Sequence, residues 1–79
     1  MAMQSPAFSF EIKKLLGVIS KGSGGWTKEL NLVSWNGKEA KFDIRDWDPD
    51  HERMTKGVTL SAKELIALRD LLNSLEIEE

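Results

Sequence analysis

The residues best suited to chemistry in this chain are the tryptophans and cations of one predicted hairpin. Asn36-Gly37 separates two alternating runs and predicts a two-residue turn with both residues at positive φ. Counting back from this turn places Lys28 opposite Arg45 and Trp26 opposite Trp47. Since side chains alternate across a strand, one face of the hairpin should carry Trp26, Lys28, Lys41, Arg45 and Trp47.

Two cations on neighbouring strands predict an anion between them. Lys28 directly across from Arg45 would be repulsive unless a carboxylate or a phosphate separates them. Basic groups beside exposed aromatic rings offer charge for a phosphate backbone and flat faces for unstacked bases. The hairpin therefore predicts a surface for single-stranded nucleic acid, with Lys21 supplying further charge and Lys56 at its rim.

The same residues also have a purely structural interpretation. Trp26 and Trp47 could form a cross-strand pair that stabilises the hairpin by some tenths of a kcal/mol to about one. Asp43 shares the predicted face and could neutralise both Lys28 and Arg45. The two interpretations are compatible, because a rigid aromatic pair is also a platform on which a base can stack.

Composition limits the class of protein. A chain of 79 residues makes one small domain, and without cysteine it has neither disulfides nor thiolate metal sites. So small a core needs another support, and oligomerisation is the obvious one. His51 is interpreted as a solvated residue of an acidic loop, not as a metal ligand, and no metal or cofactor is expected. The sequence shows no membrane span and no signal peptide, so a cytoplasmic, nucleoid-associated protein is expected.

The charges are segregated along the chain. The formal net charge is −2, which argues against nucleic acid. Residues 1–41, however, hold six lysines against three glutamates, whereas residues 42–79 hold five cations against ten carboxylates. Net charge is a weak guide when the signs separate in this way, although binding should be sensitive to salt.

The hydrophobic pattern predicts an α+β fold with the order ββββα. Strands are expected over residues 8–19, 26–35, 38–47 and 57–60, with a bulge or bend near Gly17 in the first. Phe42 and Ile44 should face the core, and Trp35 lies on the core side of its own strand. Ser61-Ala-Lys-Glu64 has the spacing of a capping box and begins a C-terminal helix.

The helix predicts a homodimer. Its leucines fall within an arc of about 120°, wide enough to touch both a curved four-stranded antiparallel sheet and a second helix. We therefore expect dimerisation through the helix and sheet. Residues 1–7 are expected to be a flexible leader, 8–75 the domain and 76–79 an acidic tail.

Five short segments in this order resemble the bacterial branch of the Positive Cofactor Four family. They are Trp26–Asn31, Val33–Gly37, Asp43–Trp47, Pro49-Asp50 and Lys56–Ser61, and the resemblance covers Phe8 to Leu75. Eukaryotic members of the family are transcriptional coactivators that bind single-stranded DNA. The resemblance implies a homodimer whose curved sheets form paired grooves for antiparallel single strands.

Only some of the family's DNA-contacting residues have a match in this sequence. Arg45 and Trp47 match the arginine and tryptophan that contact DNA on the family's third strand. The eukaryotic serine, arginine and aromatic of the second strand, and two lysines around the turn, are replaced here by Leu32, Ser34, Asn36, Gly37 and Glu39. The expected footprint therefore shifts toward Trp26, Lys28 and the Lys21 loop.

The sequence thus predicts a non-enzymatic, sequence-independent single-stranded-DNA-binding protein that serves transcription, recombination, repair or DNA uptake. No nucleophile with a nearby base, rigid carboxylate pair or phosphate loop is present. Two alternatives stay open. The outer face could dock a protein of the transcription or recombination machinery, or the ligand could be single-stranded RNA, because no residue marks a reader of the 2′-hydroxyl.

Overall fold

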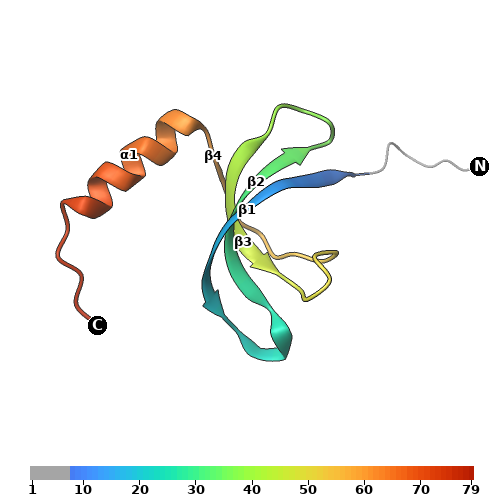
Figure 1. Ribbon diagram of the computed structural model, residues 1–79, viewed down its shortest axis with the longest axis horizontal. Coiled ribbons are helices and arrows are strands. Elements are labelled where there is room, and N and C mark those ends of the chain that lie inside the picture. The colour runs from blue at the N-terminus through green and yellow to red at the C-terminus, as the bar shows by residue number, and fades with distance from the viewer. Residues whose placement is uncertain (1–7) are drawn as a thin grey trace, which may run out of the picture.

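The structure is a curved antiparallel sheet followed by a C-terminal helix. This computed structural model describes residues 8–79, so the predicted leader at 1–7 lies outside the described residues. The strands are β1 (Phe10–Lys21), β2 (Thr27–Trp35), β3 (Lys41–Trp47) and β4 (Val58–Leu60), and the helix is α1 (Ala62–Asn73). A short turn, η1 (Ser23–Gly25), joins β1 to β2. The four strands are ordered β1-β2-β3-β4, which confirms the predicted α+β class and element order (Figure 1).

Irregular pairing bends the sheet. The β1–β2 ladder shifts register within residues 12–14, 15–17 and 18–20, and each extra residue bends its strand and increases the local twist. The irregularity expected near Gly17 is confirmed, and two more accompany it. As a result the rings of Phe10 and Trp47 are centred 5.2 Å apart. Phe10 lies opposite Trp35 and Trp47 opposite Thr27, at the two ends of β2, which a flat sheet would separate by about 26 Å.

The hairpin turn is as predicted, but the register beyond it is not. Asn36 and Gly37 have φ of 53° and 75°, and the N–H of Lys38 donates to the carbonyl of Trp35 at 3.0 Å. Residues 38–40 then leave the ladder, and it resumes with Val33 opposite Lys41. One residue of β2 thus faces two of the returning chain, which is a bulge. The predicted pairs Trp26–Trp47 and Lys28–Arg45 are therefore wrong.

A shift of one residue exchanges the two faces of β3. β2 keeps its predicted sides, with Glu29, Asn31 and Val33 buried. On β3 the buried side chains are Asp43 and Trp47, both fully shielded, whereas Phe42 and Ile44 are half-buried on the other face. The expectation that Phe42 and Ile44 face the core while Asp43 and Trp47 face outward is wrong. The core lies on the concave side, covered by the loop of residues 48–57.

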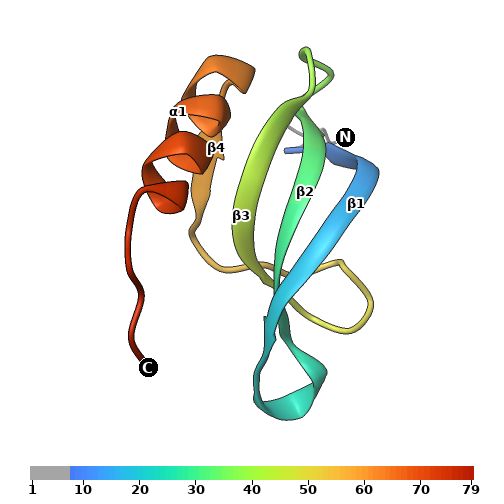
Figure 2. The ribbon, with the colours of Figure 1, turned by 60° about the vertical axis from the view of Figure 1, so that its left-hand side comes forward.

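The helix lies on the convex side of the sheet, opposite the 48–57 loop (Figures 1 and 2). The capping box is confirmed, because Ser61 Oγ accepts from the N–H of Glu64 and Glu64 Oε1 accepts from the N–H of Ser61. α1 packs against β3 and β4, and none of its residues is buried. Its exposed apolar side chains are Ile66, Leu71 and Leu72, followed in the chain by Leu75.

Candidate nucleic-acid interface

Arg45 is held by a network inside the concave face. Its Nε and Nη2 lie 2.6 and 2.7 Å from the two carboxylate oxygens of Asp43, a bidentate pair. Thr59 Oγ1 donates to Asp43 Oδ2 at 3.0 Å. Arg45 Cζ lies 4.5 Å from the centre of the Trp35 ring, and Nη1 donates to the carbonyl of Thr55. With its side chain only 13% exposed, Arg45 could reach a phosphate only by leaving Asp43.

Gly57 lets the chain before β4 pass directly over this arginine. A Cβ built at Gly57 would lie 2.4 Å from Arg45 Cβ and 2.3 Å from the carbonyl oxygen of Ile44. Any side chain there would push the loop off β3. The Lys56-Gly57 segment is therefore a packing element of the Arg45 network, and Lys56 itself remains exposed.

Trp47 belongs to the core and has no open face. It is fully buried between Phe10, at 5.2 Å between ring centres, and His51, at 5.7 Å with the rings 26° from parallel. The expectation that Trp47 projects beside Trp26 as an exposed stacking ring is wrong. Trp35 is half-buried against Phe8 and Phe10, which agrees with its predicted structural role.

The predicted shared face is divided between two sides of the sheet. Lys28 pairs with Asp46 across the ladder, with Nζ 2.9 Å from Oδ1, whereas Arg45 stands opposite Glu29. Each cation thus has its own carboxylate, and the expected Lys28–Arg45 repulsion does not arise. Trp26 and Lys28 stay together, with Asp46 on the same side, and Arg45 and Trp47 lie on the other side with Lys41.

His51 was missed as a structural residue by sequence reasoning. Its Nε2 lies 2.9 and 3.0 Å from the carboxylate oxygens of Glu29, which also accepts hydrogen bonds from Thr27 and Asn31. His51 has φ of 57° and stacks on Trp47, so it ties the 48–57 loop to the concave face. The expectation of a solvated histidine holds only in part, because the side chain is 37% exposed but also binds Glu29. Its partner is 22 positions away, and no local signal marks that contact.

Glu29 should make the fold sensitive to acid. Burial raises the pKa of Glu29, but hydrogen bonds from Thr27 and Asn31 and the contact with His51 together lower it below the ordinary value. A folded-state pKa below the unfolded value of about 4.3 gives stability that is present above that value and lost as pH falls through the folded pKa. Urea unfolding from neutral pH to about pH 3 should show this loss, and Glu29→Gln should flatten it. An equal acid slope in the variant would contradict the assignment.

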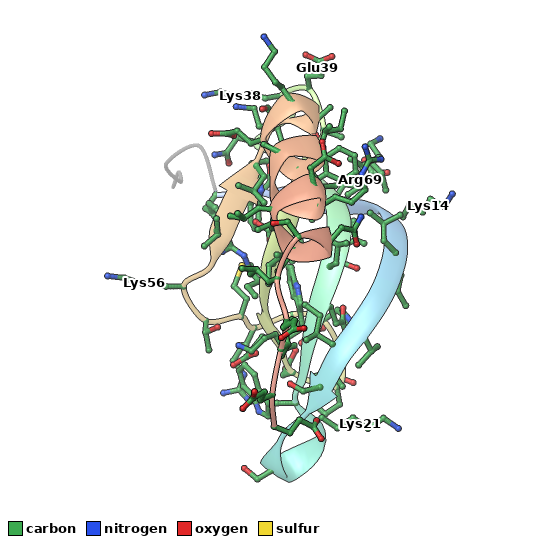
Figure 3. All side chains as sticks on the ribbon, turned by 90° about the vertical axis from the view of Figure 1, so that its left-hand side faces the viewer. Lys14, Lys21, Lys38, Glu39, Lys56 and Arg69 are labelled. Carbon is green, nitrogen blue, oxygen red and sulfur yellow. The ribbon has the colours of Figure 1, made fainter. Side chains whose placement is uncertain are left out.

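The remaining lysines are distributed around the rim of the sheet. Figure 3 shows Lys21 at one end of the hairpin and Lys38 and Glu39 at the other, with Lys14 and Lys56 pointing away from opposite edges. All of these side chains, and Lys41, are exposed. The rim therefore carries exposed positive charge, whereas Arg45 is neutralised inside the sheet by Asp43.

Trp26 stands beside this rim at the Lys21 end. It is half-buried and lines an open pocket of about 400 Å³ together with Gly22, Ser23, Asp46 and Thr55. Sequence reasoning placed Trp26, Lys28 and Lys21 in one region and the structure brings them there, although Asp46 was overlooked as their neighbour.

The fold and this site define a small α+β domain whose described surface offers an aromatic side chain and peripheral cations. Within residues 8–79 no group of three or more His, Asp or Glu side chains could hold a metal ion. The α1 helix is too short and polar to cross a bilayer, and the described part of the chain contains no other helix that could.

Residues 23–71 match the family profile of Transcriptional Coactivator p15 (PC4). The chain is also 48% identical over 71 residues to a protein of Treponema pallidum (strain Nichols) named only "Uncharacterized protein", covering 90% of this chain and 84% of that one. The chain belongs to the PC4 family of DNA-binding, coactivator-like domains, and its bacterial relative confirms the predicted bacterial branch.

Proposed function

We propose that this chain is a non-enzymatic homodimer that binds single-stranded DNA without strong sequence preference. The proposal rests on membership of the PC4 family, whose members bind nucleic acid and are not enzymes. The geometry supports it through Trp26, which lines an open pocket beside Lys28 and near Lys21. A base stacks on Trp26 while the exposed lysines follow the phosphates.

The buried network has a supporting part in this proposal. Lys21, Lys28, Lys41 and Lys56 supply the phosphate contacts, because their side chains are accessible. Arg45 and Trp47 fix the curvature that presents them, and Arg45 contributes a phosphate contact only when it exchanges Asp43 for the ligand. Such binding places the protein on nucleoid DNA in the cytoplasm, in transcription, recombination, repair or DNA uptake.

The exposed helix supports the dimer. Ile66, Leu71 and Leu72 are 46–57% exposed although each is large and apolar. Val33 and Trp47 are the apolar side chains fully buried in the described residues, which is a small core for an independent fold. A second copy packed on α1 and the adjoining β4 would bury this surface and leave the Trp26 pocket open. We therefore place the dimer interface at the helix and β4.

Oligo-thymidine should quench the fluorescence of Trp26 and bind a protein of twice the 8.9 kDa chain mass. Trp26→Ala should weaken binding roughly tenfold or more, because a stacked base contributes roughly 1–3 kcal/mol. Trp26→Phe keeps an aromatic face, so it should retain binding while the quenching disappears. Fluorescence anisotropy of a labelled oligonucleotide measures both variants, and sedimentation equilibrium measures the mass.

Duplex DNA and salt provide the controls for this titration. The duplex should bind more weakly, and raising the salt should lower affinity for the single strand because counterions are released from neutralised phosphates. No binding at low salt would overturn the proposal and favour a protein partner for the same face. Equal or tighter binding of oligo-uridine would instead identify RNA as the ligand.

A further inference from the structure

The pocket beside Trp26 has walls that are fixed before any ligand binds. On one side the N–H of Gly22 donates to the carbonyl of Trp26 at 2.7 Å, and the N–H of Trp26 donates to the carbonyl of Ser23 at 3.3 Å. On the other side the N–H of Thr55 donates to the carbonyl of Asp46, and Thr55 Oγ1 accepts from the N–H of Asp46. The turn and the β3 end are thus both locked by backbone hydrogen bonds.

Gly25 locks the turn against the neighbouring loop. It has φ of 82°, in the left-handed region that favours glycine, and a Cβ there would lie 2.8 Å from Pro49 Cγ. Close packing of this turn on Pro49 holds Trp26 in place. The pocket is therefore a built feature of the fold and does not depend on a flexible loop closing.

The size and lining of the pocket suit one planar base. Its volume of about 400 Å³ lies near the lower end of the range for small-molecule sites, roughly 300–1,000 Å³. The Trp26 ring offers a stacking face, and the polar lining comes from Ser23, Asp46 and Thr55. Small-molecule sites combine apolar or aromatic walls with a few polar groups, and here Trp26 supplies the aromatic part of an open pocket whose other lining residues are mostly polar.

Asp46 would repel a nucleic acid if it were not compensated. Lys28 Nζ lies 2.9 Å from Asp46 Oδ1, and the two side chains are 45% and 36% exposed. The ion pair cancels the negative charge that a phosphate backbone would meet, and it leaves Oδ2 and the second lone pair of Oδ1 for two further donors. Asp46 can therefore accept hydrogen bonds from a ligand that is itself part of a polyanion.

A carboxylate at the edge of a stacking pocket selects among the bases. It only accepts hydrogen bonds, so it favours the base edge with the most donors. The Watson–Crick edge of guanine carries adjacent donors at N1 and N2. Adenine and cytosine each carry a single amino group there, and thymine carries a single N–H. We propose that the Trp26–Asp46 pocket is a guanine subsite within the proposed single-stranded-DNA surface, on whose function this inference rests.

A single guanine in oligo-thymidine should raise affinity about tenfold, because a bidentate contact to a base discriminates by roughly 1–3 kcal/mol. Placing the guanine at successive positions finds the register in which it reaches the pocket. Replacing this guanine by hypoxanthine, which lacks the 2-amino group, should remove most of the gain. Replacing it by 7-deazaguanine should keep the gain, because both donors remain. Competition anisotropy at fixed salt measures these ratios.

Asp46→Asn should bring the affinity for the guanine oligonucleotide down to that for oligo-thymidine, because an amide presents one acceptor oxygen. Glu39→Gln is the matched control, since it removes one exposed negative charge at the opposite end of the hairpin (Figure 3) and should keep the guanine gain. Oligo-thymidine binding with no guanine gain at any position, or a larger gain for adenine or cytosine, would overturn the guanine subsite alone. Failure to bind any oligonucleotide would overturn the proposed function as well.

Discussion

Trp47→Ala should remove a large part of the stability of this chain, whereas Trp26→Ala should cost far less. Trp47 is fully buried against Phe10 and His51, and truncating a buried tryptophan to alanine costs about 3–5 kcal/mol. The free energy of unfolding expected for a chain of 79 residues is roughly 4–12 kcal/mol. Chemical denaturation at one fixed protein concentration measures both variants, because a dimer's apparent stability depends on concentration.

Trp47→Phe separates packing from hydrogen bonding at the same position. The indole N–H of Trp47 is buried without a hydrogen-bond partner among the described residues, so deleting it removes no interaction. The phenyl ring still fills part of the space, and the loss of stability should be clearly smaller than for alanine. If Trp47→Ala unfolded at the wild-type denaturant concentration, the ring would not be part of the core.

Local chemistry allowed much of the backbone to be predicted. Asn36-Gly37 and Ser61–Glu64 act through their own backbone and neighbouring residues, so the turn and the helix start are as predicted. The irregularity near Gly17 was also visible in the sequence, as a break in the alternation of apolar and polar residues. These features depend on interactions within a few residues, which a sequence displays directly.

The register of β3 could not be predicted from the turn. An extra residue within 38–40 changes the pairing after the turn closes, and nothing in the turn signal specifies it. Hydrophobic alternation could not correct the error, because the buried face carries Glu29, Asn31 and Asp43 while the other face carries leucines. Burial of these polar groups depends on partners far along the chain, such as His51 for Glu29.

The one extra residue within 38–40 explains why the observed site differs from the predicted one. Trp26 and Lys28 precede the shift and keep their predicted neighbourhood near Lys21. Arg45 and Trp47 follow it, and both move from the expected open surface to the concave core. A one-residue slip transfers every later side chain of the strand to the other face, so candidate site residues were misplaced although the number and order of the strands were correct.

Arg45→Met should destabilise the fold by about 3–5 kcal/mol, because it leaves the fully buried Asp43 carboxylate without its cation. Adding Asp43→Asn should recover much of this loss, since the amide can still accept from Thr59 and no buried charge remains. Denaturant unfolding of the wild type, both single variants and the double variant gives the coupling between the two side chains. If the losses in unfolding free energy of the two single variants simply add in the double variant, Arg45 and Asp43 are not energetically coupled.

Arg45→Lys distinguishes the structural role of this arginine from direct DNA contact. Lysine keeps the positive charge but has neither the planar fork that fits Asp43 nor the flat guanidinium that stacks on Trp35. If Arg45 acts within the network, the lysine variant should unfold more easily, and its affinity for oligo-thymidine, measured where it is folded, should stay near that of the wild type. If Arg45 binds phosphate as its main task, Arg45→Lys should keep stability but lose affinity. The bidentate contact with a fully shielded carboxylate favours the first result, because a cation already desolvated and paired inside the fold gains little by moving to a phosphate.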